Sequence, residues 1–303
     1  MIEEISILNK TLNQTILFNK SEAGFLLDND NAIDWGYLNA SISDYHTVSR
    51  VGVGVNNVEV SEGRNISIVG WLINDAYGTI EEKKKQLNTF CNPFDDIVIY
   101  AGQFKISGSF SQTVQYSKSN KENNEIICKF MLRIFCADPL FTYHDPQEAT
   151  SYDTYQQLFT FPLIWLTGED IVFGIRPGLN EFSLKNAGTL ATGFEAYLTV
   201  NAAVAGVTIT NTTTGKSLKL KSSVTFESGD IIYINTTFGA RVIKVGQSLD
   251  SLTNAFQTFD LSSEFIEVIP GANNMSVTVE TGEIGSIDAQ FYIEPLFYAL
   301  EEQ

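Results

Sequence analysis

Two histidines are the only imidazole side chains that this sequence offers for acid–base or nucleophilic chemistry. His46 lies in an alternating, strand-like run, and His144 stands next to Asp145. No Gly-x-Ser-x-Gly nucleophile elbow occurs, so the sequence does not support a Ser-His-Asp arrangement. We therefore expect His46 to be a surface or partly buried side chain and His144 to lie in a solvated linker at the domain border, neither with a catalytic role.

Three other motifs resemble ligand sites, but each lacks something that the site requires. The run from Asp28 to Asn31 begins like a calcium loop, without the glycine at position six or the glutamate at position twelve. Asp95 and Asp96 are adjacent, and adjacent strand residues point to opposite faces, so a shared carboxylate site is not expected. Residues 51–55 are glycine-rich, but no lysine or helix start follows to hold a phosphate. We expect no enzyme, no cofactor and no metal site.

The three cysteines, Cys91, Cys128 and Cys136, cannot pair off completely. Cys128 and Cys136 fall on one face of a single extended run, about 26 Å apart at the usual rise of a strand. We expect all three to be small core side chains of a protein that folds in a reducing cytoplasm.

Length and charge narrow the class of protein further. At 303 residues the chain exceeds the roughly 250–300 residues at which single cores stop growing, so two domains are expected. The formal net charge of −17 disfavours specific binding of nucleic acids, whose phosphates it would repel. No apolar run approaches the length of about 20 residues that a membrane helix needs. Glu3 and Glu4 stand where a secretory signal would carry lysines, so export by that route is not expected.

The run from Ile126 to Phe141 predicts both an architecture and a domain border. Apolar residues occupy every even position from 126 to 136, which is typical of a long β-strand with one face in a core. Asp138-Pro139 ends it, because proline cannot donate to the strand ladder. We place an N-terminal domain at residues 1–145 and a C-terminal domain at residues 146–303.

The first half is predicted to contain strands and one helix. Thr79 and Glu82 fit a capping box, which places a helix near residues 80–91, before Asn92-Pro93. Strands are expected at 97–100 and 103–113, the latter forming a large hairpin with the strand after 126.

The second half is predicted to be mainly β. Residues 146–170 are irregular and rich in aromatic side chains. Short strands at intervals of roughly ten residues then indicate a sandwich or jelly roll. They include 195–201, 207–211, 217–221, 231–235, 240–245, 265–269, 276–280 and 289–293.

An ordered series of motifs resembles a known family. The motifs are residues 63–72, 87–93, 135–141, 186–189, 209–215 and 269–274. In this order the series resembles the distal tail protein (Dit) family of long-tailed bacteriophages and prophages of Gram-positive bacteria. The chain departs from that pattern in its longer aromatic stretch at 146–175 and in having Ala187 in the 186–189 turn.

The resemblance implies a fold and a function. It implies a ring-forming N-terminal domain of sandwich or hairpin type and a C-terminal β-sandwich similar to galectins. Such proteins are six-fold structural hubs at the tip of the virion tail, made in the cytoplasm of the bacterial host. The implied partners are copies of the chain itself, the tail tube protein and a tail-associated tip protein. A receptor-binding protein or a cell-wall polysaccharide is a further partner of the family type.

The second face of strand 126–136 suggests how a ring would be held together. Some of its side chains are apolar and need cover, which a neighbouring subunit or the protein's own helix could supply. The candidate interface residues are Met131, Arg133, Phe135, Asp138, Pro139, Leu140 and Phe141. The net charge also favours an acidic or neutral lumen, to which DNA would not adhere.

A carbohydrate-binding protein of a phage or bacterial surface is the alternative function. β-Sandwiches often present aromatic platforms to sugars, although such side chains also pack between domains. The candidate platform consists of Tyr152, Tyr155, Trp165 and Tyr197. The two functions are compatible, because one domain could assemble while the other binds sugar.

Overall fold

The computed structural model describes residues 4–19, 24–28, 32–37, 40–46, 53–60, 63–144, 150–152, 156–157, 174–175 and 181–300. For 40–46, 53–60, 150–152, 156–157 and 174–175 it describes backbone strands only. The chain divides into two compact units, one formed by Met1–Asp145 with Phe297–Gln303 and the other by Pro146–Leu296. The second unit is therefore inserted between two segments of the first.

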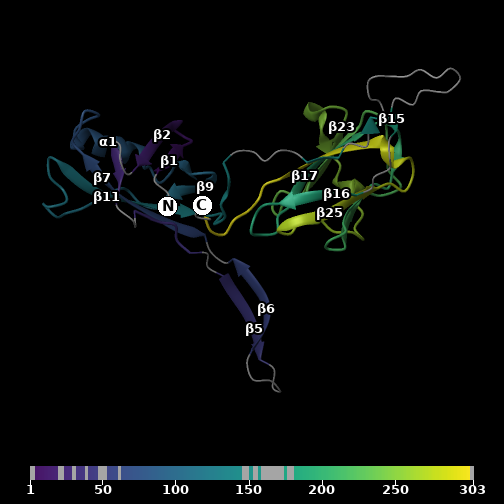
Figure 1. Cartoon of the computed structure of the whole chain (residues 1–303), viewed down its shortest axis with the longest axis horizontal. Coiled ribbons are helices and arrows are strands. Elements are labelled where there is room, and N and C mark those ends of the chain that lie inside the picture. Colours follow the sequence, from purple (N-terminus) through teal and green to yellow (C-terminus); the bar gives the residue numbers. More distant parts are fainter. Residues whose placement is uncertain are drawn as a thin grey trace. The chain divides into compact units, whose positions relative to one another are not determined.

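A ten-stranded sheet forms the body of the first unit (Figure 1). Its central path runs β10-β11-β7-β3-β2-β1-β8-β9-β12, with β4 paired to β7. The strands are β1 (Glu4–Asn9), β2 (Gln14–Asn19), β3 (Phe25–Leu27), β4 (Ile33–Asp34), β7 (Arg64–Ile73), β8 (Asp96–Ala101), β9 (Phe104–Phe110), β10 (Gln115–Tyr116), β11 (Ile127–Cys136) and β12 (Thr142–Tyr143). Strands β5 (Ala40–His46) and β6 (Val53–Val60) pair separately as a two-stranded sheet.

This sheet closes on itself, because β11 pairs with both β7 and β9. The mainly β class with a short α-helix is confirmed, and the first unit is a closed sheet where the resemblance implied a domain of sandwich or hairpin type. The expected hairpin with β11 forms through β10, at Gln115↔Met131 and Tyr116↔Phe130, and through β9, but the longer ladder of β11 with β7 was not predicted. Ten residue pairs join β11 to β7, from Ile127↔Ile73 to Cys136↔Arg64, whereas only Ile134↔Phe110 and Phe135↔Ser109 join it to β9. Strands β7 and β11 each have ten residues, so they can pair along their whole length.

Helix α1 (Ile80–Phe90) begins at the predicted capping box. The Thr79 hydroxyl accepts from the Glu82 backbone N–H at 3.3 Å, and the Glu82 carboxylate accepts from the Thr79 N–H at 2.9 Å. Ile80, Leu87 and Phe90 of this helix are buried in the core of the first unit. The helix therefore covers one end of the sheet through its apolar side, as its sequence pattern predicts.

The core of the first unit contains the alternate residues of β11. Cys128, Phe130, Leu132, Ile134 and Cys136 are buried, which confirms the predicted core face. Ile126 is an exception, because it precedes the strand and is 69% exposed. All three cysteines are buried and free, and burial raises the pKa of the Cys91 and Cys136 thiols to about 12.

The second unit is a β-sandwich. One sheet has the order β13-β26-β17-β22-β23-β24 and the other the order β16-β25-β19-β20. Both contribute to one core, with Leu198 and Phe291 from the first and Ile209 and Val277 from the second. The strands are β13 (Thr150–Tyr152), β16 (Glu181–Asn186), β17 (Phe194–Val200), β19 (Thr208–Asn211), β20 (Lys216–Lys219), β22 (Ile231–Asn235), β23 (Val242–Gly246), β24 (Thr253–Asn254), β25 (Gly271–Thr278) and β26 (Ile287–Ile293).

Shorter elements complete the second unit. Two further strand pairs are β18 (Val204–Ala205) with β21 (Thr225–Phe226), and β14 (Gln156–Gln157) with β15 (Gly174–Ile175). Three 3-10 turns are η1 (Leu249–Ser251), η2 (Phe256–Thr258) and η3 (Ile284–Ser286). The aromatic stretch at 146–170 lies largely outside the described residues. Within the ranges given above, no helix has the length and apolar character to span a membrane.

Candidate functional site

The face of the β7–β11 ladder that points away from the core carries a mixed, partly exposed set of side chains. Trp71, Val69 and Ile73 of β7 lie on this face, opposite Lys129, Met131 and Ile127 of β11. Each of these side chains is half-buried, whereas Arg133 is exposed and Phe135 is 42% exposed. We call this set the outer face of the β7–β11 ladder.

Part of this outer face is organised by one carboxylate. Asp28 accepts a hydrogen bond from the Trp71 indole N–H at 2.9 Å and forms an ion pair with Lys129 at 2.7 Å. The Lys129 ammonium also lies 5.0 Å from the centre of the Trp71 ring, which is cation–π geometry. Asp28 thus organises side chains on the surface of the sheet, and residues 29–31 of the calcium-loop-like run lie outside the described residues.

The remaining candidate interface residues follow the end of β11 and differ in their exposure. Asp138 is exposed, Pro139 and Leu140 are half-buried, and Asp138 accepts from the Leu140 backbone N–H at 3.1 Å. Phe141 differs, because it is 1% exposed and packs edge-on against Trp35 at 5.7 Å. Its ring belongs to the core of the first unit, so it has no surface to offer a neighbouring subunit.

Arg64, the first residue of β7, is a buried cation close to the end of β11. Its guanidinium donates to the backbone oxygens of Pro139 at 2.8 Å, Trp35 at 3.2 Å and Tyr298 at 2.6 Å. It also lies 4.7 Å from the centre of the Phe141 ring. Burial lowers the pKa of Arg64 below its ordinary value. Sequence reasoning could have found it only through the rarity of an arginine at an inward-facing strand position.

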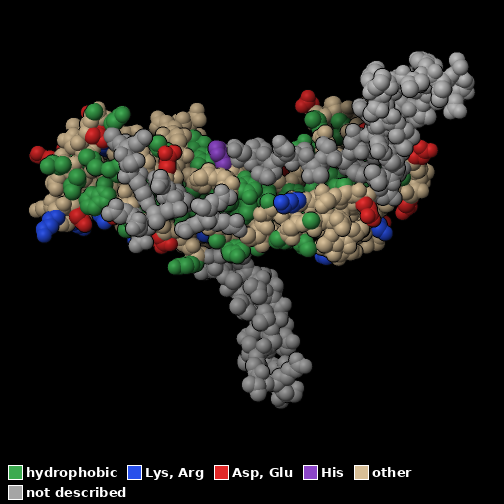
Figure 2. All heavy atoms as spheres, viewed as in Figure 1, with side chains coloured by type: hydrophobic (Ala, Val, Ile, Leu, Met, Phe, Trp, Pro, Cys, Tyr) green, Lys and Arg blue, Asp and Glu red, His purple; other side chains and the backbone are tan. Residues whose placement is uncertain are grey.

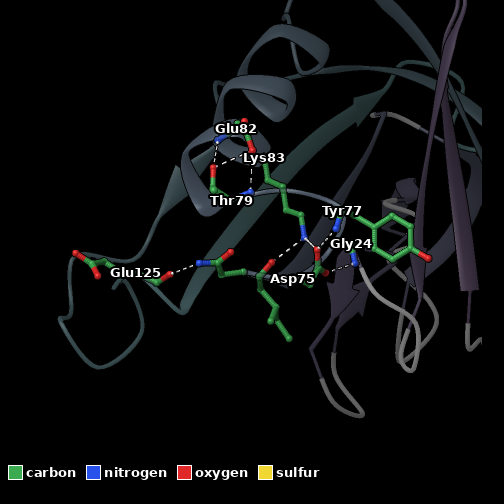
Figure 3. A network of polar contacts seen from close by, with 9 residues as sticks. Gly24, Asp75, Tyr77, Thr79, Glu82, Lys83 and Glu125 are labelled. Atoms are coloured by element: carbon green, nitrogen blue, oxygen red, sulfur yellow. Dashed lines mark hydrogen bonds and ion pairs between the residues drawn. The ribbon is translucent and has the colours of Figure 1, made fainter.

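A second buried cation joins helix α1 to the sheet (Figure 3). Lys83 is buried and donates to the Asp75 carboxylate at 2.6 Å and to the Ile73 backbone oxygen at 2.7 Å. Asp75 also accepts from the backbone N–H groups of Tyr77 and Gly24. The hydrogen bond from Lys83 is the largest cause that lowers the pKa of Asp75. This network is structural, because each of these hydrogen bonds joins groups of the first unit.

Three asparagines in the motifs of the second half also have structural roles. Asn186, Asn211 and Asn273 are buried. Asn186 donates to the backbone oxygens of Leu190 and Val268, and Asn211 donates to the side-chain oxygen of Asn273. These motifs therefore fix turns of the sandwich and present no reactive group.

The candidate sugar platform is only partly described. Tyr155 and Trp165 lie outside the described residues, and for Tyr152 only its place in β13 is described. Tyr197 of β17 is half-buried and lines a cavity of 470 Å³ on the face of the six-stranded sheet that points away from the core. Its ring centre lies 4.8 Å from that of Tyr233 and 5.8 Å from that of Tyr292. Tyr233 and Tyr292 were not recognised from the sequence, because nothing local shows that β22 and β26 flank β17.

The structure also locates the histidines and the paired aspartates that the sequence analysis considered. His144 is exposed and its ring lies 4.6 Å from that of Tyr100. Asp95 is buried and accepts a hydrogen bond from the Asn9 amide at 2.8 Å, whereas Asp96 is exposed. Among the described residues, no cluster of His, Cys, Asp and Glu has a geometry that could hold a metal ion. His46 falls in β5, and residues 51–52 of the glycine-rich run lie outside the described residues.

Comparisons with known proteins place this fold in a class. Residues 187–291 match the family described as siphovirus-type tail component, C-terminal domain. The crystal structure of the Dit protein of phage SPP1 superposes with a TM-score of 0.63 at 12% identity, covering 97% of this chain and 99% of that one. Two structures of the phage P2 baseplate in its activated conformation, with calcium and with strontium, give TM-scores of 0.44 and 0.42. Their identities are 11% and 10%, each over 97% of this chain and 98% of that chain.

No curated protein sequence matches the chain. The second unit therefore contains a segment that matches a siphovirus-type tail component, and the whole chain has the fold of SPP1 Dit. The family match and the fold of SPP1 Dit agree with the resemblance to the distal tail protein (Dit) family seen in the sequence motifs.

Proposed function

We propose that the chain forms a closed homohexameric ring at the distal end of a phage tail. The ring joins the tail tube protein to the tail-associated tip protein and carries host-recognition components. Its work is mechanical, and it performs no chemistry of its own. The observation that carries this proposal is the likeness of fold, over 97% of the chain, to SPP1 Dit, a protein described as a paradigm of the hub adsorption apparatus.

The outer face of the β7–β11 ladder is the ring contact that we propose. Large apolar side chains that remain exposed on a soluble unit favour association when they lie together. Met131 and Phe135 lie on the same face of β11, and Met131 is opposite Val69 of β7. Arg133 lies between them and can pair with an acidic side chain of a neighbouring copy. Contacts of this head-to-tail kind close into a ring when the rotation between copies is right.

The first test measures the mass of the assembled protein. Native mass spectrometry of the purified full chain is expected to give six copies, and negative-stain images are expected to show rings. A monomer at every concentration would contradict the proposal, and a ring of another size would correct its stoichiometry. The bore is expected to be acidic or neutral, in keeping with the net charge of −17. A lysine-lined bore would contradict that part.

The second test addresses the contact itself. Phe135→Asp is expected to convert rings to monomers, because a buried, unpaired carboxylate is strongly unfavourable in an interface. Phe94→Asp is the control, since Phe94 is 94% exposed but lies in the turn after α1. If Phe135→Asp leaves the rings intact, the outer face is not the contact. If Phe94→Asp alone disrupts them, the contact lies at the helix end.

A further inference from the structure

The cavity beside Tyr197 results directly from strand alternation in the six-stranded sheet. Glu195, Tyr197 and Thr199 of β17 line it, together with Asp288, Gln290 and Tyr292 of β26. The residues between them, among them Leu198 and Phe291, point the other way and are buried in the core. Because the backbone ladder pairs Tyr197 with Gln290 and Thr199 with Asp288, the lining is one continuous surface on two adjacent strands. We call it the tyrosine cavity.

Two aromatic rings, those of Tyr197 and Tyr292, line the tyrosine cavity, and Tyr233 does not line it but packs against Tyr197. Tyr197 lies between Tyr233 of β22 and Tyr292 of β26, tilted by 40° to the first and nearly perpendicular to the second. Tyr292 is 37% exposed, so part of its ring is open to a ligand. Ile231 and Leu249 add apolar surface at the edge. Aromatic side chains of this kind combine a flat apolar face with a hydroxyl that both donates and accepts.

Polar side chains surround this aromatic wall and are held in place by their neighbours. Glu195 accepts a hydrogen bond from the Asn235 amide at 3.1 Å, and Asp288 accepts one from Asn201 at 2.6 Å. The Asn235 amide also donates to the Tyr233 hydroxyl at 3.3 Å. Burial is the largest cause that raises the pKa of Tyr197, with a contribution from Glu195, so its hydroxyl keeps its proton at neutral pH. The cavity thus offers oriented carboxylate, amide and hydroxyl groups.

The charge of the lining restricts the ligand. The described lining contains two carboxylates, Glu195 and Asp288, and no lysine or arginine. An anionic ligand such as a phosphate-rich polymer would meet like charge there. A ligand with many hydroxyl groups and an apolar face, and without negative charge, would find a partner for each of its surfaces. The cavity volume of 470 Å³ falls within the range of about 300–1,000 Å³ that is usual for small-ligand sites.

We propose that the tyrosine cavity binds an uncharged saccharide, with a pyranose ring stacked on Tyr197 or Tyr292. The hydroxyl groups of the sugar bind Glu195, Gln290 and Asp288. The proposal does not depend on the ring or on its stoichiometry. Of the platform expected from the sequence it uses Tyr197, and it adds Tyr292. The sugar is either a free one or part of a surface polymer, and both present the same chemistry.

The test uses the full chain and soluble neutral disaccharides: lactose, cellobiose, maltose and N,N′-diacetylchitobiose. Saturation-transfer NMR is expected to detect binding of at least one of them. Glucuronic acid is expected to bind at least tenfold more weakly than glucose, because its carboxylate meets Glu195 and Asp288. If none of the four disaccharides binds, the proposal is wrong. Equal binding of glucuronic acid and glucose would overturn the charge argument on which it rests.

Matched variants locate the site. Tyr197→Ala and Gln290→Ala are each expected to weaken binding at least tenfold, and Gln290 is exposed, so its replacement leaves the core intact. Phe238→Ala is the control, since Phe238 is an 85% exposed aromatic residue of the same unit outside the cavity. Binding that survives both cavity variants, or that Phe238→Ala abolishes, would overturn the assignment. Retention on insoluble chitin or cellulose would identify a polymer ligand, and binding of soluble sugars alone would identify a free one.

Discussion

The guanidinium of Arg64 donates a hydrogen bond of 2.6 Å to the backbone oxygen of Tyr298, joining residues that are 234 positions apart in the chain. The same side chain binds the backbone oxygen of Pro139, just after β11. Arg64 therefore holds together the start of β7, the exit of β11 and the segment that returns from the second unit. Its position explains why a buried cation is tolerated, because backbone oxygens surround it.

Replacing Arg64 by methionine is expected to destabilise the first unit strongly. The buried oxygens of Trp35, Pro139 and Tyr298 would lose their donor, and each unsatisfied group costs about 1–3 kcal/mol. We expect the free energy of unfolding to fall by about 3 kcal/mol or more on this basis. Urea titration followed by the fluorescence of Trp35 and Trp71, in a Trp165→Phe background, measures it. Arg133→Met, at an exposed position of β11, is the control and is expected to change stability by about 0.5 kcal/mol or less.

Acidification is expected to weaken the attachment of α1 through Asp75. The pKa of Asp75 is lowered in the folded protein, chiefly by Lys83, so its stabilisation is present above the ordinary aspartate pKa of about 3.9. That stabilisation is lost as the pH falls through the lowered value. At pH 7, Asp75→Asn is expected to be less stable than the wild type, and the difference should shrink toward zero in strong acid. A difference that does not vary with pH, or a similar effect of the exposed control Glu81→Gln, would contradict this.

The capping box of α1 gives a third prediction. Thr79→Ala removes the hydroxyl that accepts from the Glu82 N–H, and loss of such a cap costs about 1 kcal/mol. Thr89→Ala removes a hydroxyl from the last turn of the same helix, where it bonds only the Lys85 backbone oxygen. Thermal unfolding is expected to separate the two variants clearly. Equal losses would mean that the helix, and not its cap, responds to these substitutions.

The buried cysteines are expected to resist thiol reagents. Burial raises the pKa of Cys91 and Cys136 to about 12 and also raises the pKa of Cys128, so the reactive thiolate is scarce. Ellman's reagent at pH 8 should label no thiol in the native protein and three per chain in urea. Rapid labelling of any thiol without denaturant would show that its segment opens readily.

Local patterns predicted much of this fold, and long-range pairing explains most of what they missed. The alternation in β11 and the Thr79–Glu82 box act over a few residues, so both were visible in the sequence. The pairing of β11 with β7 depends on residues about sixty positions away, and the hairpin with β9 was the nearer choice. The sheet closes because β11 pairs with β7 in addition to β9, so its closure could not be predicted without the β7 pairing.

Polar residues in buried places account for the other errors. Strand β25 begins at Gly271, five residues before the predicted strand. Its early part contains the polar residue Asn273, which is buried because its amide donates to the backbone oxygens of Ile269 and Gly271. Such a sequence is typical of a turn. Strand β16 was not predicted, since only Leu184 and Asn186 of its six residues are buried. The tyrosine cavity was foreseen only at Tyr197, because its other walls come from strands distant in the chain.

The antiparallel bridge between Phe141 and Phe297 has a consequence for how the molecule tolerates change. The chain leaves the first unit soon after Phe141 and re-enters it at Phe297. The backbones of these two residues are hydrogen-bonded to each other. The sandwich is thus an inserted domain that two adjacent chain segments connect to the first unit. Another domain whose two ends lie close together could replace it, in evolution or by design. The ten-stranded sheet of the first unit would then keep all of its strands.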